Sequence, residues 1–438
     1  MKYEEYKDCS VEWIGEVPSH WEVCRLKNYS KIVLGKMLMS TPPKGEEAKY
    51  TSEKYLKSRN VGWMDIYDNY DDLEDMWFNE YEKSIYQLQL NDIVMNEGGD
   101  IGKLGIWKNS EFPCYIQNSI NKITANRNII PFYLQYLLFA IAKTNYFWSI
   151  VNPISIAHLT KEKLSNTPIL VPPLSEQQAI ATYLDEKCEK INTAIEVQKK
   201  KIELLEELKY SIITDAVTKG LNPKAPMKDS GVEWIGEVPS HWEIMKTSLS
   251  FNHIGSGTTP STSKGEYYDD EGAYWLQTGD LTDGLIEDTS KKVSKTAIKE
   301  CNLKFYPEDS VVIAMYGATI GKMGLLKVQC ATNQACCVLP RNKFMDARYT
   351  FYFFLSAKSD LLISAIGGGQ PNISQDVIKK TKITKPPLTE QQAIAIHLDK
   401  ECDKIATQIS KANRRIELLE ELKQSIITEA VTGKIKVC

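Results

Sequence analysis

The string VEWIGEVPSHWE occurs twice in the chain, at residues 11–22 and 232–243. A longer segment is also repeated, at residues 172–218 and 386–432, and most of its positions are identical in the two copies. The segments in between, 24–171 and 245–385, share only scattered matches. A tandem repeat that diverges only in its middles indicates that the flanks keep one task in both copies, whereas the middles have taken on different tasks. The chain is therefore two copies of one unit.

Length and composition indicate a folded protein of two or more domains. The chain has 438 residues, of which 42% are hydrophobic, enough for packed cores in both halves. Its start, MKYEEYKDCS, lacks the basic and apolar regions of a signal peptide, and no apolar run approaches the ~18 residues of a membrane span. We therefore expect a cytoplasmic protein. The net charge of −4 argues against nonspecific coating of nucleic acid but leaves room for local basic faces.

The ten cysteines show no metal-binding pattern, because there is no CxxC pair and no histidine at zinc-finger spacing. We predict no metal site. Cys188 and Cys402 occupy equivalent repeat positions, which we interpret as small buried side chains at a helix contact.

The long repeated segments are predicted to be amphipathic helices. Each begins after a Pro-Pro pair, and Ser175 or Thr389 then precedes Glu-Gln-Gln as a candidate N-cap. An apolar stripe follows at intervals of three or four residues; it includes Ile191, Ile195, Ile202, Leu205 and Ile212 in the first copy and Ile405, Ile409, Ile416, Leu419 and Ile426 in the second. About 43 helical residues would span about 65 Å, too long for one small domain to bury. We expect the two helices to form an antiparallel coiled coil related by a pseudo-twofold axis, with a lone helix on its own domain as the alternative.

The middles are predicted to be mixed α/β domains with short strands. Residues 92–96 and 311–315 indicate strands, and residues 132–138 and 349–355 indicate short helices. GGDIGKLGI, which begins at Gly98, aligns with GATIGKMGL, which begins at Gly317. Both middles should therefore share one fold with altered surfaces.

Catalytic motifs are not recognisable. IGKM at residues 320–323 resembles part of a phosphate-binding loop, but Tyr316 and Met323 replace the glycine and the Ser or Thr that such a loop needs. No glycine-rich cofactor loop follows a strand, and the five histidines form no triad-like or metal-like set. We predict no catalytic residue and no cofactor.

The order of these segments resembles the DNA specificity subunit of type I restriction-modification systems. The resemblance covers essentially the whole chain and is carried by VEWIGEVPSHWE, a variable domain, PPLSEQQAIATYLDEK and IELLEELKYSIITDAVTKG, followed by the whole set again. It implies an α/β fold in which two target recognition domains each read one half of a split DNA sequence. It also implies that the paired helices fix the spacer, that two modification subunits methylate adenine, and that restriction subunits cleave. The chain itself would be non-catalytic and would serve in defence against phage.

The predicted organisation follows from the repeat. We expect a first repeat segment at 1–23, target recognition domain 1 at 24–171, a central helix at 172–221, a linker with the second repeat segment at 222–244, target recognition domain 2 at 245–385 and a C-terminal helix at 386–438.

Candidate DNA-reading residues are polar side chains in glycine-rich or turn-like stretches, because such side chains read base edges. In the first domain, where LGKMLMSTPP departs from the GxGTTP form of the second, they are Lys36, Arg59, Asn60, Asn96, Lys103, Gln117 and Asn118. In the second they are Ser256, Thr258, Thr259, Gln277, Thr278, Tyr316, Lys322, Asn333, Gln334, Gln370 and Asn372. For each, a turn that satisfies its own backbone remains the alternative.

Candidate partner-binding residues lie where both halves stay alike, as a shared interface requires. They are Trp13, Trp21, Glu176, Gln177 and Gln178 in the first half and Trp234, Trp242, Glu390, Gln391 and Gln392 in the second. The tryptophans could equally be packed against their own helices.

Two other functions stay open from the sequence. A structural scaffold without a DNA role fits the helices and the acidic pI, although it does not explain why only the middles diverged. A DNA-reading enzyme would need an active site of a kind that we do not recognise.

Overall fold

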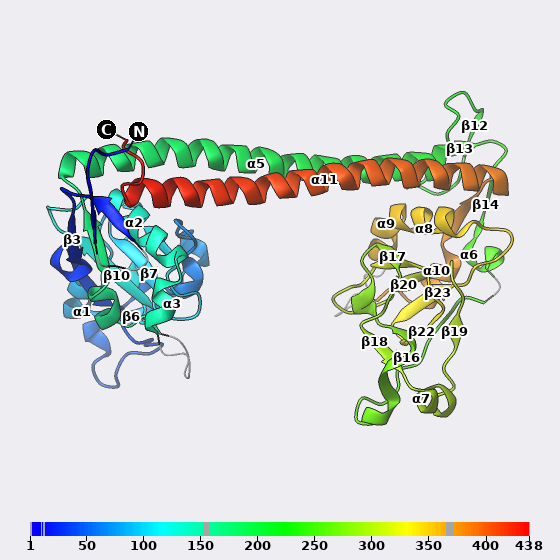
Figure 1. Cartoon of the computed structure of the whole chain (residues 1–438). Helices are drawn as coiled ribbons and strands as arrows, with labels where there is room; N and C mark the ends of the chain where they lie inside the picture. The colour runs from blue at the N-terminus through cyan, green and yellow to red at the C-terminus, as the bar shows by residue number, and fades with distance from the viewer. Residues whose placement is uncertain are drawn as a thin grey trace. The chain divides into compact units, whose positions relative to one another are not determined.

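The computed structural model describes residues 2–9, 11, 14–151, 158–251, 253–364 and 372–437. The chain divides into two compact units (Figure 1). Unit 1 comprises Met1–Gln198 together with Arg414–Cys438, and unit 2 comprises Lys199–Asn413.

Two sheets form the globular part of unit 1. The larger is antiparallel, in the order β4 (Ser30–Leu34), β10 (Ile120–Ala125), β7 (Ile93–Asn96) and β8 (Leu104–Ile106). The smaller has the order β6 (Glu74–Asn79), β5 (Tyr50–Leu56) and β9 (Tyr115–Ile116), with β5 and β9 parallel. Helix α2 (Pro131–Lys143) packs against the larger sheet. It starts with a proline, whose fixed φ and missing N–H suit a first helical turn.

Unit 2 repeats this plan, and each of its two main sheets has one strand more. One has the order β15 (Gly255–Ser256), β23 (Cys336–Leu339), β20 (Val311–Ala314), β21 (Met323–Leu326) and β17 (Gly284–Ile286). The other has the order β18 (Lys291–Val293), β16 (Tyr268–Leu276), β22 (Cys330–Thr332) and β19 (Phe305–Tyr306). Helix α8 (Ala347–Ser356) covers β20 and β21. The strands and helices expected at residues 92–96, 311–315, 132–138 and 349–355 are confirmed.

Short helices complete both globular parts. In unit 1 they are η1 (Leu26–Asn28), η2 (Glu47–Lys49), η3 (Ser58–Asn60), η4 (Tyr70–Asp72), α1 (Glu80–Tyr86), α3 (Tyr146–Ile150) and α4 (Lys161–Ser165). In unit 2 they are α6 (Thr247–Ser250), η5 (Gly265–Tyr267), η6 (Thr278–Asp280), α7 (Lys295–Glu300), α9 (Lys358–Ser364) and α10 (Gln375–Lys380).

The repeated VEWIGEVPSHWE segment belongs to two small ribbons in each unit. In unit 1, β1 (Tyr6–Asp8) pairs with β2 (Glu16–Pro18), and β3 (Glu22–Arg25) pairs with β11 (Pro168–Val171). In unit 2 the same pairs are β12 (Met227–Asp229) with β13 (Glu237–Pro239), and β14 (Glu243–Lys246) with β24 (Lys382–Lys385).

Each long helix contributes to both units. They are α5 (Leu174–Lys219) and α11 (Leu388–Val431), and both begin one residue before the predicted N-cap. Within unit 1 the start of α5 and the end of α11 share one apolar core, through Ile180 and Leu184 on α5 and Ile427 and Val431 on α11. Farther along, Lys423 donates to Asn192 at 2.8 Å, so the two segments run antiparallel.

In unit 2 the end of α5 and the start of α11 share an apolar core in the same way. Its core contains Ile213 and Val217 of α5 with Ile394 and Leu398 of α11. Cys188 and Cys402 are buried in the two cores, which confirms the interpretation of these cysteines as small side chains at a helix contact. No helix in the described part of the chain is long and apolar enough to cross a bilayer.

Candidate nucleic-acid interface

In unit 2, backbone hydrogen bonds bring together three candidate loops that follow the ends of β15, β16 and β22. We call this end of the sheets the edge of the unit. The N–H of Thr258 donates to Thr332 O at 2.9 Å, and the N–H of Asn333 donates to Leu276 O at 3.0 Å. The loops at residues 255–259, 277–280 and 333–335 therefore adjoin one another. The approach requires glycine at position 257, because a Cβ there would lie 1.7 Å from Thr332 O.

Unit 1 builds the same edge from a different sequence. The N–H of Lys36 donates to Ile116 O at 3.0 Å, and the N–H of Gln117 donates to Leu56 O at 3.0 Å. Gly35 takes the place of Gly257, since a Cβ there would lie 2.3 Å from Gln117 O. The backbone of LGKMLMSTPP thus follows that of the GxGTTP segment, although its side chains differ.

One loop of each edge contains a short helix, η3 in unit 1 and η6 in unit 2, and the two helices begin with the same cap. In unit 1 the side chain of Asn60 accepts the N–H of Lys57 at 3.1 Å, and in unit 2 Asp280 accepts the N–H of Gln277 at 2.8 Å. Sequence reasoning missed Asp280. Its position relative to Leu276, which matches that of Asn60 relative to Leu56, is a signal that could have found it.

Several side chains at the edge of unit 2 are exposed. Thr258, Thr259 and Gln334 are exposed. Tyr316, 37% exposed, and the exposed Asn372 adjoin the same loops, because the N–H of Met315 donates to Ala335 O at 2.8 Å and the N–H of Ile373 donates to Met315 O at 2.7 Å. Thr259 donates to the side-chain oxygen of Gln334, which links two of the loops.

The other candidates of unit 2 are half-buried or engaged. Gln277, Thr278 and Asn333 are half-buried. Ser256 accepts a hydrogen bond from Gln375 at 2.9 Å, and Lys322 pairs with Asp283 at 3.0 Å. Gln370 lies outside the described residues.

In unit 1 three of the candidates are buried. The Lys36 ammonium lies 2.5 Å from Glu82 and 2.7 Å from Trp77 O, so its charge is neutralised internally. Asn60 donates to Tyr67 O, and Asn96 donates to Ser58 O, at 3.2 Å in both cases. These contacts assign the three side chains to the construction of the edge.

The remaining candidates of unit 1 are more accessible. Arg59 is 59% exposed and pairs with Glu74 at 3.0 Å, and Lys103 pairs with Asp100 at 2.5 Å. Gln117 and Asn118 are half-buried, and their side chains bond to each other at 2.6 Å.

The repeated Glu-Gln-Gln motif makes contacts within its own unit. Glu176 accepts hydrogen bonds from Trp21 at 3.0 Å, His20 at 2.7 Å and Tyr3 at 3.0 Å. Burial alone would raise the pKa of this carboxyl, but the bonds from His20, Trp21 and Tyr3 hold the pKa below its usual value. In unit 2, Glu390 lies 2.9 Å from His241, while the buried indole N–H of Trp242 has no partner in the described structure.

The first glutamine of each motif ties the long helix to its globular part. Gln177 is fully buried; its side chain accepts the N–H of Ile130 at 2.8 Å and donates to Asn128 O and Pro172 O. Gln391 is also fully buried and bonds to Asp346 N, Phe344 O and Pro386 O in the same way. Both residues therefore fix the start of a long helix.

Few of the candidate partner-binding side chains remain accessible. Gln178 and Gln392 are exposed, whereas Trp21 and Trp242 are fully buried. Trp234 is half-buried against Phe353, with ring centroids 5.5 Å apart, and Trp13 lies outside the described residues.

Known proteins share this organisation. The chain matches the type I restriction modification DNA specificity domain twice, at residues 18–207 and 239–420. It is 26% identical over 442 residues to the type I restriction enzyme MjaVIII specificity subunit of Methanocaldococcus jannaschii, across 96% of this chain and 94% of that protein. It is also 26% identical over 203 residues to the EcoR124I/EcoR124II specificity subunit of Escherichia coli, across 44% and 46% of the two chains.

A solved chain from a study of assembly and conformational transition in the type I R-M system has a similar fold. The TM-score is 0.71 at 17% identity, with 96% of this chain and 99% of that chain covered. The two family matches coincide with the two copies of the edge, the capped loops and the Glu-Gln-Gln motif. This chain, with one specificity domain in each half, belongs to the type I restriction modification DNA specificity domain family.

Proposed function

We propose that the chain is the DNA-recognition subunit of a type I restriction-modification complex and performs no catalysis itself. Residues 24–171 and 245–385 each read one half of an asymmetric, bipartite site in double-stranded DNA. The observation that carries this proposal is that one backbone edge is built twice with different side chains. Shared geometry with different hydrogen-bonding groups suits two readers that approach DNA alike but select different bases.

The long helices set the spacer between the two half-sites. Each belongs to both units, so its length links one reader to the other. The segments that are alike in both halves receive two copies of one modification subunit, which methylates adenine at N6. Restriction subunits join this assembly and cleave unmodified DNA. We place the complex in the cytoplasm, in line with a role against incoming phage DNA.

Base reading is assigned to the accessible side chains of each edge. In unit 2 the exposed ones are Thr258, Thr259, Tyr316, Gln334 and Asn372, and Gln277, Thr278 and Asn333 are half-buried; in unit 1 Arg59 is exposed, and Lys103, Gln117 and Asn118 are half-buried. Lys36, Asn60 and Asn96 support the edge from within, because the Lys36 ammonium and the side-chain amide N–H groups of Asn60 and Asn96 bond to the protein.

The test is the methylome of a host that expresses this chain with its modification subunit. We expect a gapped, bipartite adenine motif that disappears when the chain is deleted. Exchange of residues 24–171 for the same segment of a relative should change one half of the motif and preserve the other half and the spacer. Unchanged methylation after deletion, with the modification subunit expressed, would refute the proposal.

A further inference from the structure

Two neighbouring apolar side chains are exposed at the edge of unit 1. Met37 is 75% exposed and Leu38 is 58% exposed. Among the described residues, no other two consecutive large hydrophobic side chains are both exposed. Single apolar side chains are common on protein surfaces, but an adjacent pair at a binding edge points to a contact with the ligand.

The loop that carries this pair is fixed on both sides. Before the pair, the N–H of Asn118 donates to Lys36 O at 2.8 Å, and after it the N–H of Trp77 donates to Met39 O at 3.1 Å. The Lys36 ammonium adds a second link, because it contacts Trp77 O at 2.7 Å and Met39 Sδ at 3.6 Å. The backbone therefore holds the two apolar side chains in one place while they remain in water.

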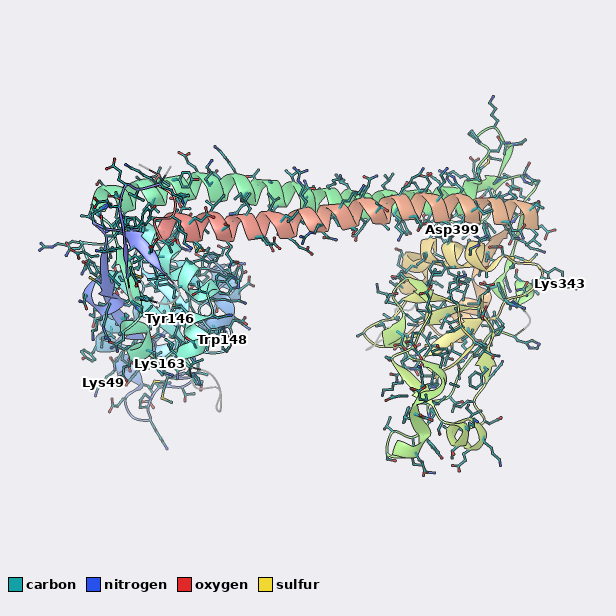
Figure 2. All side chains as sticks on the ribbon, in the orientation of Figure 1. Lys49, Tyr146, Trp148, Lys163, Lys343 and Asp399 are labelled. Carbon is teal, nitrogen blue, oxygen red and sulfur yellow. The ribbon has the colours of Figure 1, made fainter. Side chains whose placement is uncertain are left out.

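The long helices do not cover this loop. The Lys36 ammonium lies 5.4 Å from the centre of the Tyr50 ring. Lys49, the residue before Tyr50, lies on the side of unit 1 that is remote from α5 and α11 (Figure 2). The exposed pair is thus open to a ligand that approaches this side of the unit.

The equivalent loop of unit 2 presents a polar group instead. Counted from Gly35 and Gly257, Met37 takes the position of Thr259. The hydroxyl of Thr259 donates to Gln334, whereas the thioether of Met37 has no proton to donate. Because the two edges share one backbone path, Met37 should meet DNA where Thr259 does, but with an apolar surface.

We infer that Met37 and Leu38 read a thymine in the half-site of unit 1 by packing against its C5-methyl group in the major groove. This inference rests on the proposed function. The thymine methyl is the apolar group that base pairs present in the grooves, so it is the group through which an apolar side chain selects a base pair. Insertion between base pairs is the other use of such side chains, but it requires the duplex to unstack and kink. An approach shared with the polar loop of unit 2 favours contact with the base edge.

Removal of the methyl group from the DNA tests this inference. The purified complex with its modification subunits is titrated with a labelled duplex that carries the bipartite site, and binding is followed by fluorescence anisotropy. Each thymine of the half-site assigned to residues 24–171 is replaced in turn by uracil, which lacks only the methyl group. We expect one replacement to weaken binding by about fourfold, as for the loss of one buried methyl group.

A double variant links this effect to the two side chains. Met37→Ser with Leu38→Ser should bind the thymine duplex more weakly and should no longer distinguish thymine from uracil. Leu90→Ser is the matched control, because Leu90 is 60% exposed and precedes β7, whose other end reaches the edge at Asn96. This control should keep the full preference for thymine, and circular dichroism verifies that each variant is folded.

The outcomes separate the inference from the proposed function. Equal affinity of the wild-type complex for thymine and uracil at every position would overturn the inference, even if the double variant bound DNA weakly, because that result would assign the pair to insertion or to general contact. A folded double variant that keeps the thymine preference would also overturn it. If the wild-type complex does not distinguish the bipartite site from an unrelated duplex, the proposed function itself fails.

Discussion

The indole N–H of Trp21 donates a hydrogen bond to the carboxylate of Glu176 at 3.0 Å, which joins the repeated PSHW segment to the start of α5. The same carboxylate also accepts bonds from His20 and Tyr3. Ionised Glu176 is therefore the centre of a small network within unit 1.

This network predicts a pH dependence of stability. Because the folded-state pKa of Glu176 is lowered, its contribution to stability is present above the unfolded pKa and is lost as pH falls through the folded value. We expect Glu176→Gln to reduce the free energy of unfolding at pH 7 and to weaken its decline between neutral and acidic pH. Denaturant titrations across that range measure both effects, and an unchanged pH profile would contradict the prediction.

The buried glutamines should stabilise the two units far more than their exposed neighbours do. Gln177→Leu and Gln391→Leu each leave several buried backbone groups unpaired, and we expect a loss of roughly 2–4 kcal/mol, since each such group costs about 1–3 kcal/mol. Gln178→Leu and Gln392→Leu are matched controls at exposed positions and should change stability by about 0.5 kcal/mol or less. Equal losses in both pairs, measured by urea denaturation, would refute the assigned contacts.

Lys36 is predicted to act on stability rather than on base selection. Lys36→Met removes the partner of Glu82, whose side chain is 20% exposed, and should cost roughly 2–3 kcal/mol, somewhat less than for a fully buried pair. The double change Lys36→Met with Glu82→Leu should recover much of that loss. An altered methylation motif in a fully stable Lys36→Met protein would instead make this lysine a reader of bases.

The close approach at Gly257 predicts a steric effect confined to one edge. Gly257→Ala places a methyl group against Thr332 O and should displace the 255–259 loop. Because this loop belongs to the reader in unit 2, methylation of the bipartite site should fall by about 10-fold or more. Gly265→Ala is the control, because Gly265 lies outside the three loops of the edge and a Cβ there meets no atom within 4 Å. Similar methylation by the two variants would contradict this account of the edge.

Gln334 is predicted to read a base in the half-site of unit 2. It is exposed, and its oxygen accepts from Thr259, while its amide N–H groups have no partner among the described residues. Gln334→Ala should relax selectivity at one position by about 1–3 kcal/mol and leave the spacer and the other half unchanged. Methylome sequencing measures this, with Gln408→Ala as the control, because Gln408 is an exposed α11 residue whose counterpart in the first half is Ala194. An unaltered motif would remove Gln334 from the readers.

The sequence was informative wherever a pattern is local or repeated. The stripe from Ile191 to Ile212 predicted a long helix, and the repeat positions of Cys188 and Cys402 predicted two helix contacts, because both features depend on spacing along one segment. The internal role of Lys36 depends on Glu82, and that of Gln177 depends on Asn128 and Ile130, which a linear pattern does not bring together.

The N- and C-terminal segments meet in unit 1, where the hydroxyl of Tyr6 donates to Gly433 O at 3.0 Å (Figure 1). This contact has a consequence for the order of folding during synthesis. All of unit 2, residues 199–413, is synthesised before residues 414–438, whereas the core of unit 1 needs Ile427, Ala430 and Val431. Unit 1, whose first residues are synthesised first, is therefore completed last. Until the end of α11 is made, the apolar residues of unit 1 that pack against it stay uncovered, and such uncovered apolar surface favours aggregation.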